Sequence, residues 1–215
     1  MSSASAQSPP ESAAPSPLRN PVFRMLWGVW VTANICMWMN DVAAAWLMTT
    51  LTTSPVMVAL VATAASLPVF LLGLPSGALA DIVDRRRLLL FTQVWVAGVG
   101  LITCMVSLAD AITPALLLVL TFGNGIGLAL RWPVYAALVP ELVQRRQLSS
   151  ALALNTIAMN ISRIAGPAVA GAVIATAGSA YVFMLNAALS VGAAFVLARW
   201  RRAPKVSALP GERFL

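Results

Sequence analysis

Six long apolar segments constrain what this chain can fold into more than any other feature of its sequence. Only 10% of the 215 residues are charged and 60% are hydrophobic, with a mean hydropathy of +0.85, whereas soluble domains carry about 25% charged residues. A bilayer core requires about 20 mostly apolar residues per helix. The sequence therefore predicts an all-α membrane protein with transmembrane helices at Phe23–Thr50, Met57–Ala80, Leu88–Ala109, Pro114–Leu138, Ala151–Ala177 and Tyr181–Ala198.

Basic residues cluster at alternate ends of these segments. They precede the first segment and follow the second, fourth and sixth, at Arg19, Arg24, Arg85, Arg86, Arg87, Arg145, Arg146, Arg199, Arg201, Arg202 and Lys205. The other connectors, 52–56, 110–113 and 178–180, contain no Lys or Arg. Because short cytoplasmic loops are enriched in Lys and Arg, both termini are expected to be cytoplasmic, in a bacterial inner membrane. The net charge of +7 then reflects topology and lipid headgroups rather than nucleic acid.

Several chemistries are excluded by what the sequence lacks. It contains no histidine, which removes His-based acid–base catalysis. Its two cysteines, Cys36 and Cys104, lie inside apolar segments, so neither a disulfide framework nor a metal site is indicated. Residues 1–20 are rich in Ser, Ala and Pro, a composition typical of a disordered tail. Residues 21–200 form the predicted six-helix bundle.

The six segments can be divided into two sets of three according to where glycine and proline occur. The middle segment of each set contains such residues, at Pro68, Gly73, Pro75 and Gly77 and at Gly166, Pro167 and Gly171. Breaks at corresponding positions of two halves indicate a 3+3 inverted repeat, as in many transporters. The alternative is that small residues simply allow helices to pack closely, and the spacing alone does not decide between them.

A polar stripe runs along the first segment. Trp30, Asn34, Trp38 and Asp41 recur at spacings of four, four and three, which places them on one helical face. This stripe is poorly suited to lipid and suits a water-filled cavity for an amphipathic substrate. A charge inside the membrane is a functional candidate because it costs about 2.5–3.5 kcal/mol to insert. Asp41 is therefore a candidate proton carrier, unless it pairs near the outer headgroups.

Arg163 lies near the middle of the fifth segment, on a face with Thr156, Asn160 and Pro167. A lone guanidinium there needs an acidic partner or an anionic substrate. We expect a direct or water-mediated contact between Arg163 and Asp41, both as transport candidates with Asn34. The alternative is that Arg163 binds backbone carbonyls that Pro167 leaves free.

Arg131 lies in the cytoplasmic third of the fourth segment. Its long side chain can reach the interface or meet Asp81 or Glu141, which favours an architectural role. Asn155 is a candidate for lining the cavity together with Trp30 and Trp38. The more common use of a membrane asparagine is to join helices, and both uses stay open.

One connector carries five charged residues in seven positions. Its notable positions are Gly77, Asp81, Asp84, Arg85, Arg86 and Arg87. The stretch resembles the helix 2–3 signature of the major facilitator superfamily, Gly-x-Leu-Ala-Asp-Arg-x-Gly-Arg-Arg, with Ile82 where that family has Arg and Asp84 where it has Gly.

Further stretches are similar to one branch of that superfamily. Gly166-Pro167-Ala-Val-Ala-Gly171 resembles the helix 5 signature of major facilitator exporters. The segments Asn40-Asp-Val-Ala-Ala-Ala-Trp46, Leu-Val-Pro140-Glu141 and Leu-Pro210-Gly211 resemble the enterobactin-exporter-like, transmembrane secretion effector branch. The resemblance implies the first half of a twelve-helix fold, with residues 201–215 as the start of a central linker.

The resemblance also implies a mechanism. Asp81 would be half of a latch whose partner helix belongs to a missing second half, with Arg131 as the local substitute. The expected function is proton-coupled efflux of a small drug- or siderophore-like molecule by alternating access, with no cofactor beyond the proton gradient. A missing C-terminal half, or a second copy, would complete the transporter. The alternatives are a phosphoryl-transfer enzyme using Asp81, Asp84 and Glu141, and a non-transporting assembly or regulatory half.

Overall fold

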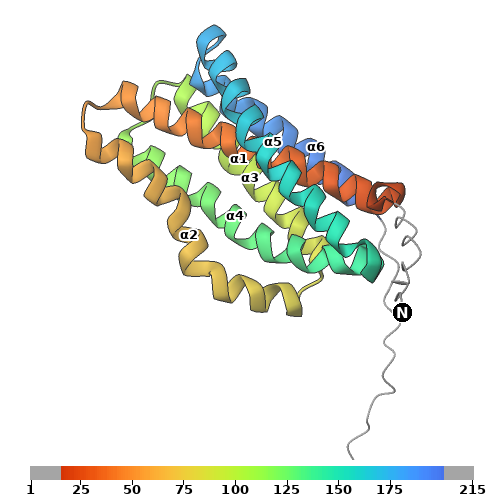
Figure 1. Ribbon diagram of the computed structural model, residues 1–215. Coiled ribbons are helices and arrows are strands. Elements are labelled where there is room, and N and C mark those ends of the chain that lie inside the picture. Colours follow the sequence, from red (N-terminus) through yellow and green to blue (C-terminus); the bar gives the residue numbers. More distant parts are fainter. Residues whose placement is uncertain (1–15, 201–215) are drawn as a thin grey trace, which may run out of the picture.

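Six long α-helices make up the protein, which a computed structural model describes over residues 16–200 apart from the side chain of Asp81 (Figure 1). Each helix is long and apolar enough to cross a membrane. The predicted all-α architecture with six membrane-spanning segments is therefore confirmed. The helices are α1 (Pro21–Leu51), α2 (Pro55–Ile82), α3 (Arg85–Leu108), α4 (Pro114–Leu142), α5 (Leu148–Thr176) and α6 (Ser179–Arg199), with the short 3-10 turns η1 (Pro17–Arg19) and η2 (Arg145–Gln147) before α1 and α5.

Local capping decides where the helices begin. Prolines open α1, α2 and α4, where the missing proline N–H is not needed. The Asp84 carboxylate caps α3 by accepting a hydrogen bond from the backbone N–H of Arg87 at 2.9 Å. A side-chain oxygen at this position satisfies a free N–H of the first turn. The helix therefore begins at Arg85, earlier than the predicted start at Leu88.

The two terminal segments predicted from composition lie mostly outside the described residues. The end of the expected tail is an exception, because Pro17–Arg19 forms the η1 turn. The side-chain amide of Asn20 donates a hydrogen bond to the carbonyl of Leu142 at 2.8 Å, which ties the start of α1 to the end of α4. Residues 17–20 therefore belong to the folded bundle rather than to a disordered tail. The expected linker at 201–215 lies outside the described residues.

The glycines and prolines of α2 and α5 do not interrupt these helices. Pro68 and Pro75 lie inside a continuous α2, and Pro167 lies inside a continuous α5. Membrane helices tolerate proline where neighbouring groups or local adjustments satisfy the freed carbonyls. The predicted breaks are thus positions of altered packing within unbroken helices.

Helix packing follows a regular pattern. The largest contacts pair α2 with α4, α1 with α5, and α3 with α6, followed by α1 with α6 and α3 with α4. Exchanging α1–α3 for α4–α6 leaves this pattern of large contacts unchanged. The first helix packs against α2, α4, α5 and α6, whereas α2 lies at one side of the bundle (Figure 1).

The buried apolar residues form two clusters, one towards each end of the helices. One cluster includes Phe23, Leu26 and Leu138, and the other includes Met39 and Phe183. Between them along the helices lie buried polar side chains, namely Asn34, Gln93, Arg131, Ser162, Asn186 and Ser190. The middle of the bundle therefore contains a buried polar layer, which is the name used below for these six residues.

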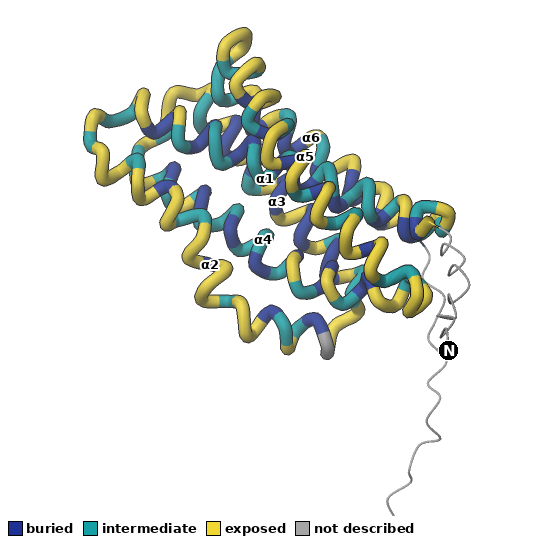
Figure 2. Tube along the Cα trace, in the orientation of Figure 1, coloured by how far each residue is buried: buried dark blue, intermediate teal, exposed yellow. Residues whose placement is uncertain are grey.

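The helices differ strongly in how much of their surface the bundle covers. In the most apolar stretch of α2 only 11% of the residues are buried, and in α5 only 22%, against 44% in both α3 and α6. Figure 2 shows α2 exposed along most of its length. Because α2 and α5 are apolar and uncovered, their outer faces must lie against lipid or another protein.

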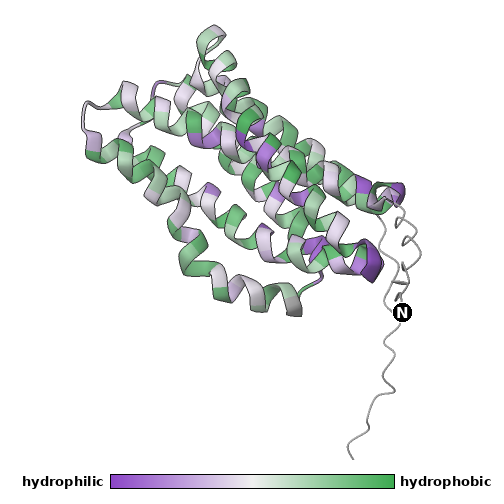
Figure 3. Ribbon diagram, in the orientation of Figure 1, coloured by the Kyte–Doolittle hydropathy of each residue, from purple (hydrophilic) through white to green (hydrophobic). Residues whose placement is uncertain are grey.

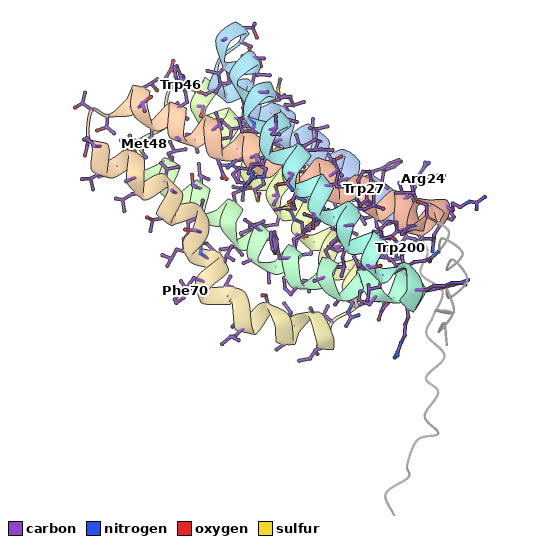
Figure 4. All side chains as sticks on the ribbon, viewed as in Figure 1. Arg24, Trp27, Trp46, Met48, Phe70 and Trp200 are labelled. Atoms are coloured by element: carbon purple, nitrogen blue, oxygen red, sulfur yellow. The ribbon has the colours of Figure 1, made fainter. Side chains whose placement is uncertain are left out.

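Charged and aromatic side chains distinguish the two ends of the bundle. Arg85, Arg86, Arg145 and Arg146 lie at one end, which we call the basic end. Arg24, Trp27 and Trp200 lie at that same end, whereas Trp46 lies at the opposite end (Figure 4). Hydropathy follows the same division, because hydrophilic residues concentrate where α4 connects to α5 while the helix bodies are mostly hydrophobic (Figure 3).

Candidate functional site

A side cavity of about 540 Å³ lies between α1, α2 and α4. Small and apolar side chains of α2 form most of its wall, including Val61, Ala65 and Phe70, and Leu128 of α4 contributes from the other side. Asp41 of α1 is the single charged residue that lines it. The volume lies within the range of about 300–1,000 Å³ that is typical of small-molecule sites, which are largely apolar with few polar groups.

The carboxylate of Asp41 faces this cavity without a counter-ion. Among the described side chains, none forms an ion pair or a hydrogen bond with it. An acidic group in the membrane that has no protein partner is available to a proton or to a positively charged ligand. The arrangement can therefore exchange a proton or a cation with the contents of the cavity.

The other members of the predicted stripe do not share this cavity. Trp30 is buried and stacks on Tyr135 of α4, with ring centres 3.9 Å apart. Asn34 is fully buried and donates a hydrogen bond to the carbonyl of Trp30 at 2.7 Å. Trp38 packs against Gly166 of α5. Trp30 and Trp38 therefore do not line this side cavity, and their lining of a substrate cavity stays a prediction.

The physical reason is that α1 has neighbouring helices on several sides. Spacings of four, four and three residues spread the stripe over an arc of about 80°. On a helix with one open face, all four residues within that arc would face the same space. Since α1 contacts α4 and α5 as well as α2, different parts of the same arc meet different helices.

Close helix approach explains one glycine of the helix 5 signature. A Cβ atom at Gly166 would lie 3.1 Å from the carbonyl oxygen of Ile35 and would overlap Trp38, so α1 and α5 can meet only if this residue is glycine. Gly171 has no atom near the corresponding position. Gly125 of α4 makes the equivalent approach to α2, where a Cβ atom would lie 2.5 Å from the carbonyl oxygen of Ala65. The remaining signature glycine of α2, Gly77, is open.

Arg163 and Asp41 are not brought together. Arg163 is exposed on the outer face of α5 and donates a hydrogen bond to the side chain of Asn160 at 3.3 Å. The inner face of α5 is formed by Ser162 and Gly166, which pack on α1. One residue along an α-helix is a turn of about 100°, so Arg163 points away from the bundle. The expected contact with Asp41 is absent from this structure.

Arg131 is buried in the middle of the bundle, with only 6% of its surface exposed. Its Nη1 donates a hydrogen bond to the carbonyl of Ala33 at 3.2 Å, and its guanidinium carbon lies 5.6 Å from the centre of the Trp30 ring. It therefore does not extend to the interface, and it does not meet Glu141, which bonds to Arg85. Because the Asp81 side chain is not described, the proposed latch with Arg131 stays a prediction.

Asn155 joins two helices. Its Oδ1 accepts a hydrogen bond from the hydroxyl of Tyr135 at 3.2 Å, which links α5 to α4. Of the two uses that the sequence left open, the structure places this asparagine in helix joining. Neither Tyr135 nor Gln93 was predicted to have a role. A polar side chain in the middle of a strongly apolar segment was the available signal for Gln93.

The arginines of the helix 2–3 signature fasten α3 to the ends of other helices. Arg85 donates to the Glu141 carboxylate at 2.8 Å and to the carbonyl of Ala137 at 3.1 Å, both in the last turns of α4. Arg86 donates to the carbonyls of Leu197 and Ala198 at the end of α6. Cations are favoured at helix C-termini, where carbonyls are unpaired. The signature thus has a structural role at the basic end.

Comparison with known proteins identifies the family. Residues 12–215 match the transmembrane secretion effector family. A staphyloferrin A transporter of Staphylococcus aureus is 27% identical over 151 residues, an alignment that covers 70% of this chain and 38% of that transporter. The chain therefore matches well under half the length of this relative. These matches leave no support for the phosphoryl-transfer alternative, and one of its carboxylates, Asp84, caps α3. The chain belongs to the transmembrane secretion effector family of major facilitator transporters, which are not enzymes.

Proposed function

We propose that this chain is one half of a secondary transporter that exports a small amphipathic molecule, drug- or siderophore-like, in exchange for protons. The observation that carries the proposal is the unpaired carboxylate of Asp41 in an otherwise apolar cavity of about 540 Å³. Such a cavity offers apolar contact to the body of a substrate and one group for a proton or a charged substrate atom. The similarity of Gly166-Pro167 to the exporter signature supports the outward direction.

The packing pattern supports alternating access between two halves. Because α1–α3 and α4–α6 make equivalent contacts, and because an odd number of spans inverts the second set, the bundle fits a 3+3 inverted repeat. This organisation is typical of transporters in which two bundles rock about a central site.

A second six-helix bundle, in the same polypeptide or as a second copy, would cover the exposed faces of α2 and α5. Arg163 and Asn160 lie on this uncovered side of α5. An intramembrane guanidinium is costly in lipid, so we propose that Arg163 meets the substrate or a polar group of that second bundle. In this arrangement residues 1–20 and 201–215 flank the bundle of residues 21–200 on the cytoplasmic side of a bacterial inner membrane, following the positive-inside rule.

Everted membrane vesicles that contain the protein together with the second six-helix bundle test this function. Ethidium serves as a fluorescent amphipathic probe, and acridine orange reports the proton flux that its transport drives. Asp41→Asn is expected to abolish ethidium-driven proton flux, because it removes the only carboxylate in the cavity. The matched variant Asp41→Glu keeps a titratable group and should retain flux. Equal flux in wild type and Asp41→Asn would contradict the proposal.

A non-transporting role as an assembly or regulatory half makes a different prediction. In that case liposomes that contain this chain together with its completing half show the same ethidium flux with Asp41→Asn as with wild type. Liposomes that contain this chain alone provide the baseline for both measurements.

A further inference from the structure

The buried polar layer contains more unfilled hydrogen-bonding atoms than any other part of the described structure. Nε and Nη2 of Arg131, both amide atoms of Gln93 and Oδ1 of Asn34 are buried without a partner among the described residues. Buried polar atoms in proteins are nearly always bonded to protein, to water or to a ligand. The layer is therefore built to hold a polar guest, and its charged member is Arg131.

The surroundings of Arg131 have the size for water. One cavity of about 10 Å³ lies between Arg131, Asn124, Asn186 and Ser190, and a second of about 10 Å³ lies between Arg131 and Gln93. A cavity of this size is about the room that one water molecule needs, and such a water requires two to four polar partners. The first cavity provides partners of this kind. We call this first cavity the Arg131 chamber.

The Arg131 chamber and the Asp41 cavity share one wall. Leu128 of α4 lines both spaces. On α1, Ala33 and Met37 line the chamber and Asp41 lines the cavity. Eight residues of helix separate Ala33 from Asp41, a rise of about 12 Å. The buried cation and the unpaired carboxylate thus lie in adjacent compartments with an apolar side chain between them.

We propose that Leu128 is a hydrophobic barrier whose displacement joins the Asp41 cavity to the Arg131 chamber. When α4 moves relative to α1, water from the cavity enters the chamber, and the Arg131 guanidinium and the Asp41 carboxylate occupy one hydrated space. The gain or loss of a proton at Asp41 then changes the interaction of α1 with α4. Leu128 is a positioning residue in this scheme, since it acts through Asp41 and Arg131. The inference rests on the proposed transport function for its consequence, but the barrier itself is measurable without transport.

A native cysteine reports on the chamber. Cys36 lines the Arg131 chamber and is 2% exposed, whereas Cys104 belongs to the apolar cluster away from the basic end. The sequence contains only these two cysteines. In a Cys104→Ser background, the reaction of Cys36 with N-ethylmaleimide therefore measures the entry of water and small solutes into the chamber.

The experiment compares two leucine truncations on α4 in membrane vesicles. Leu128→Ala should raise the Cys36 labelling rate about tenfold or more, because removal of buried apolar carbons makes hydration of the barrier less costly. Leu130→Ala is the matched control, since Leu130 is also half-buried on α4 but lines neither space. The bulkier Leu128→Phe should label no faster than wild type. Equal rates for Leu128→Ala and Leu130→Ala overturn the proposal.

Two further variants keep the result decisive. If Leu128→Ala does not fold by circular dichroism and gel filtration, Leu128→Val should give an intermediate acceleration, and a wild-type rate overturns the proposal. Adding Ala62→Trp, which fills the Asp41 cavity from α2, should return fast labelling to the wild-type rate. Fast labelling that persists shows another route and overturns the proposal. If ethidium transport is lost while the Cys36 labelling response is intact, only the proposed function is contradicted.

Discussion

Arg131 and Arg163, two arginines that lie away from the ends of their helices, occupy opposite kinds of surroundings. Arg131 lies at the centre, where a carbonyl of α1, an indole ring and the buried polar layer surround it. Arg163 lies at the edge, on the uncovered face of α5, with Asn160 as its hydrogen-bond partner. The sequence suggested the reverse, namely an architectural role for Arg131 and a paired guanidinium for Arg163. The depth of a charge in the membrane and the direction in which it faces are separate properties.

The largest expected effect compares the two faces of α5. Gly166→Leu should prevent the close approach of α1 and α5 and destabilise the bundle by about 3 kcal/mol, because the new side chain overlaps helix α1. Gly171→Leu is the matched control, since its position is open. Thermal unfolding in detergent is the measurement. Similar midpoints for the two variants would show that α5 does not pack on α1 through Gly166.

The next effect compares the two arginines directly. Arg131→Ala should lower the free energy of unfolding by about 2 kcal/mol, because it leaves a cavity beside Trp30. Arg163→Ala should change it by no more than about 0.5 kcal/mol, as expected of an exposed side chain. Thermal unfolding of both variants of the purified six-helix chain checks the contrast. A larger loss for Arg163→Ala would reverse the assignment of centre and edge.

A smaller effect tests the aromatic side of the Arg131 surroundings. Trp30→Leu should cost about 1 kcal/mol beyond the lost apolar area, because it removes the stacking on Tyr135. Trp46→Leu provides the control, since Trp46 is 55% exposed at the opposite end. The same unfolding assay applies. If the two tryptophan variants behave alike, the stack contributes nothing specific.

The smallest effect concerns a charge pair at the basic end. Glu141→Gln removes the ion pair with Arg85, whose side chains are 20% and 19% exposed. Such partly exposed pairs contribute about 0.2–1 kcal/mol and are screened by salt. The expected loss of stability is therefore small at low salt. It should be absent at 1 M salt, where the Debye length is about 3 Å and the charges are screened. A loss that does not depend on salt would indicate that the ion pair is not what Glu141 contributes.

The architecture was predictable because it depends on local properties of the chain. The length of an apolar run fixes a membrane span, and the residue types at a connector set its charge, so six spans and the family signatures follow from the sequence. The start of α3 was predicted at Leu88, but the helix begins at Arg85 because Asp84 caps it.

The arrangement of the site depends on which helices lie next to one another, and the sequence does not specify this. The face shared by Trp30 and Asp41 follows from helical spacing, but which helix each one meets follows from the neighbours of α1 on several sides. Likewise the sequence suggested Asp81 or Glu141 as a partner of Arg131, whereas the groups that surround it are a backbone carbonyl and residues of other helices. Leu128 carried no signal at all, since an apolar residue in an apolar helix is the default.

The contacts of Arg85 and Arg86 have a consequence for how the protein is made. On the proposed orientation, their charges hold the α2–α3 connector in the cytoplasm while the nascent chain inserts. After folding, the same guanidinium groups occupy carbonyls at the ends of α4 and α6, which are synthesised later. Lysine at both positions preserves the charge but not the forked geometry of arginine. Biogenesis and final assembly are thus two separable demands on one pair of residues.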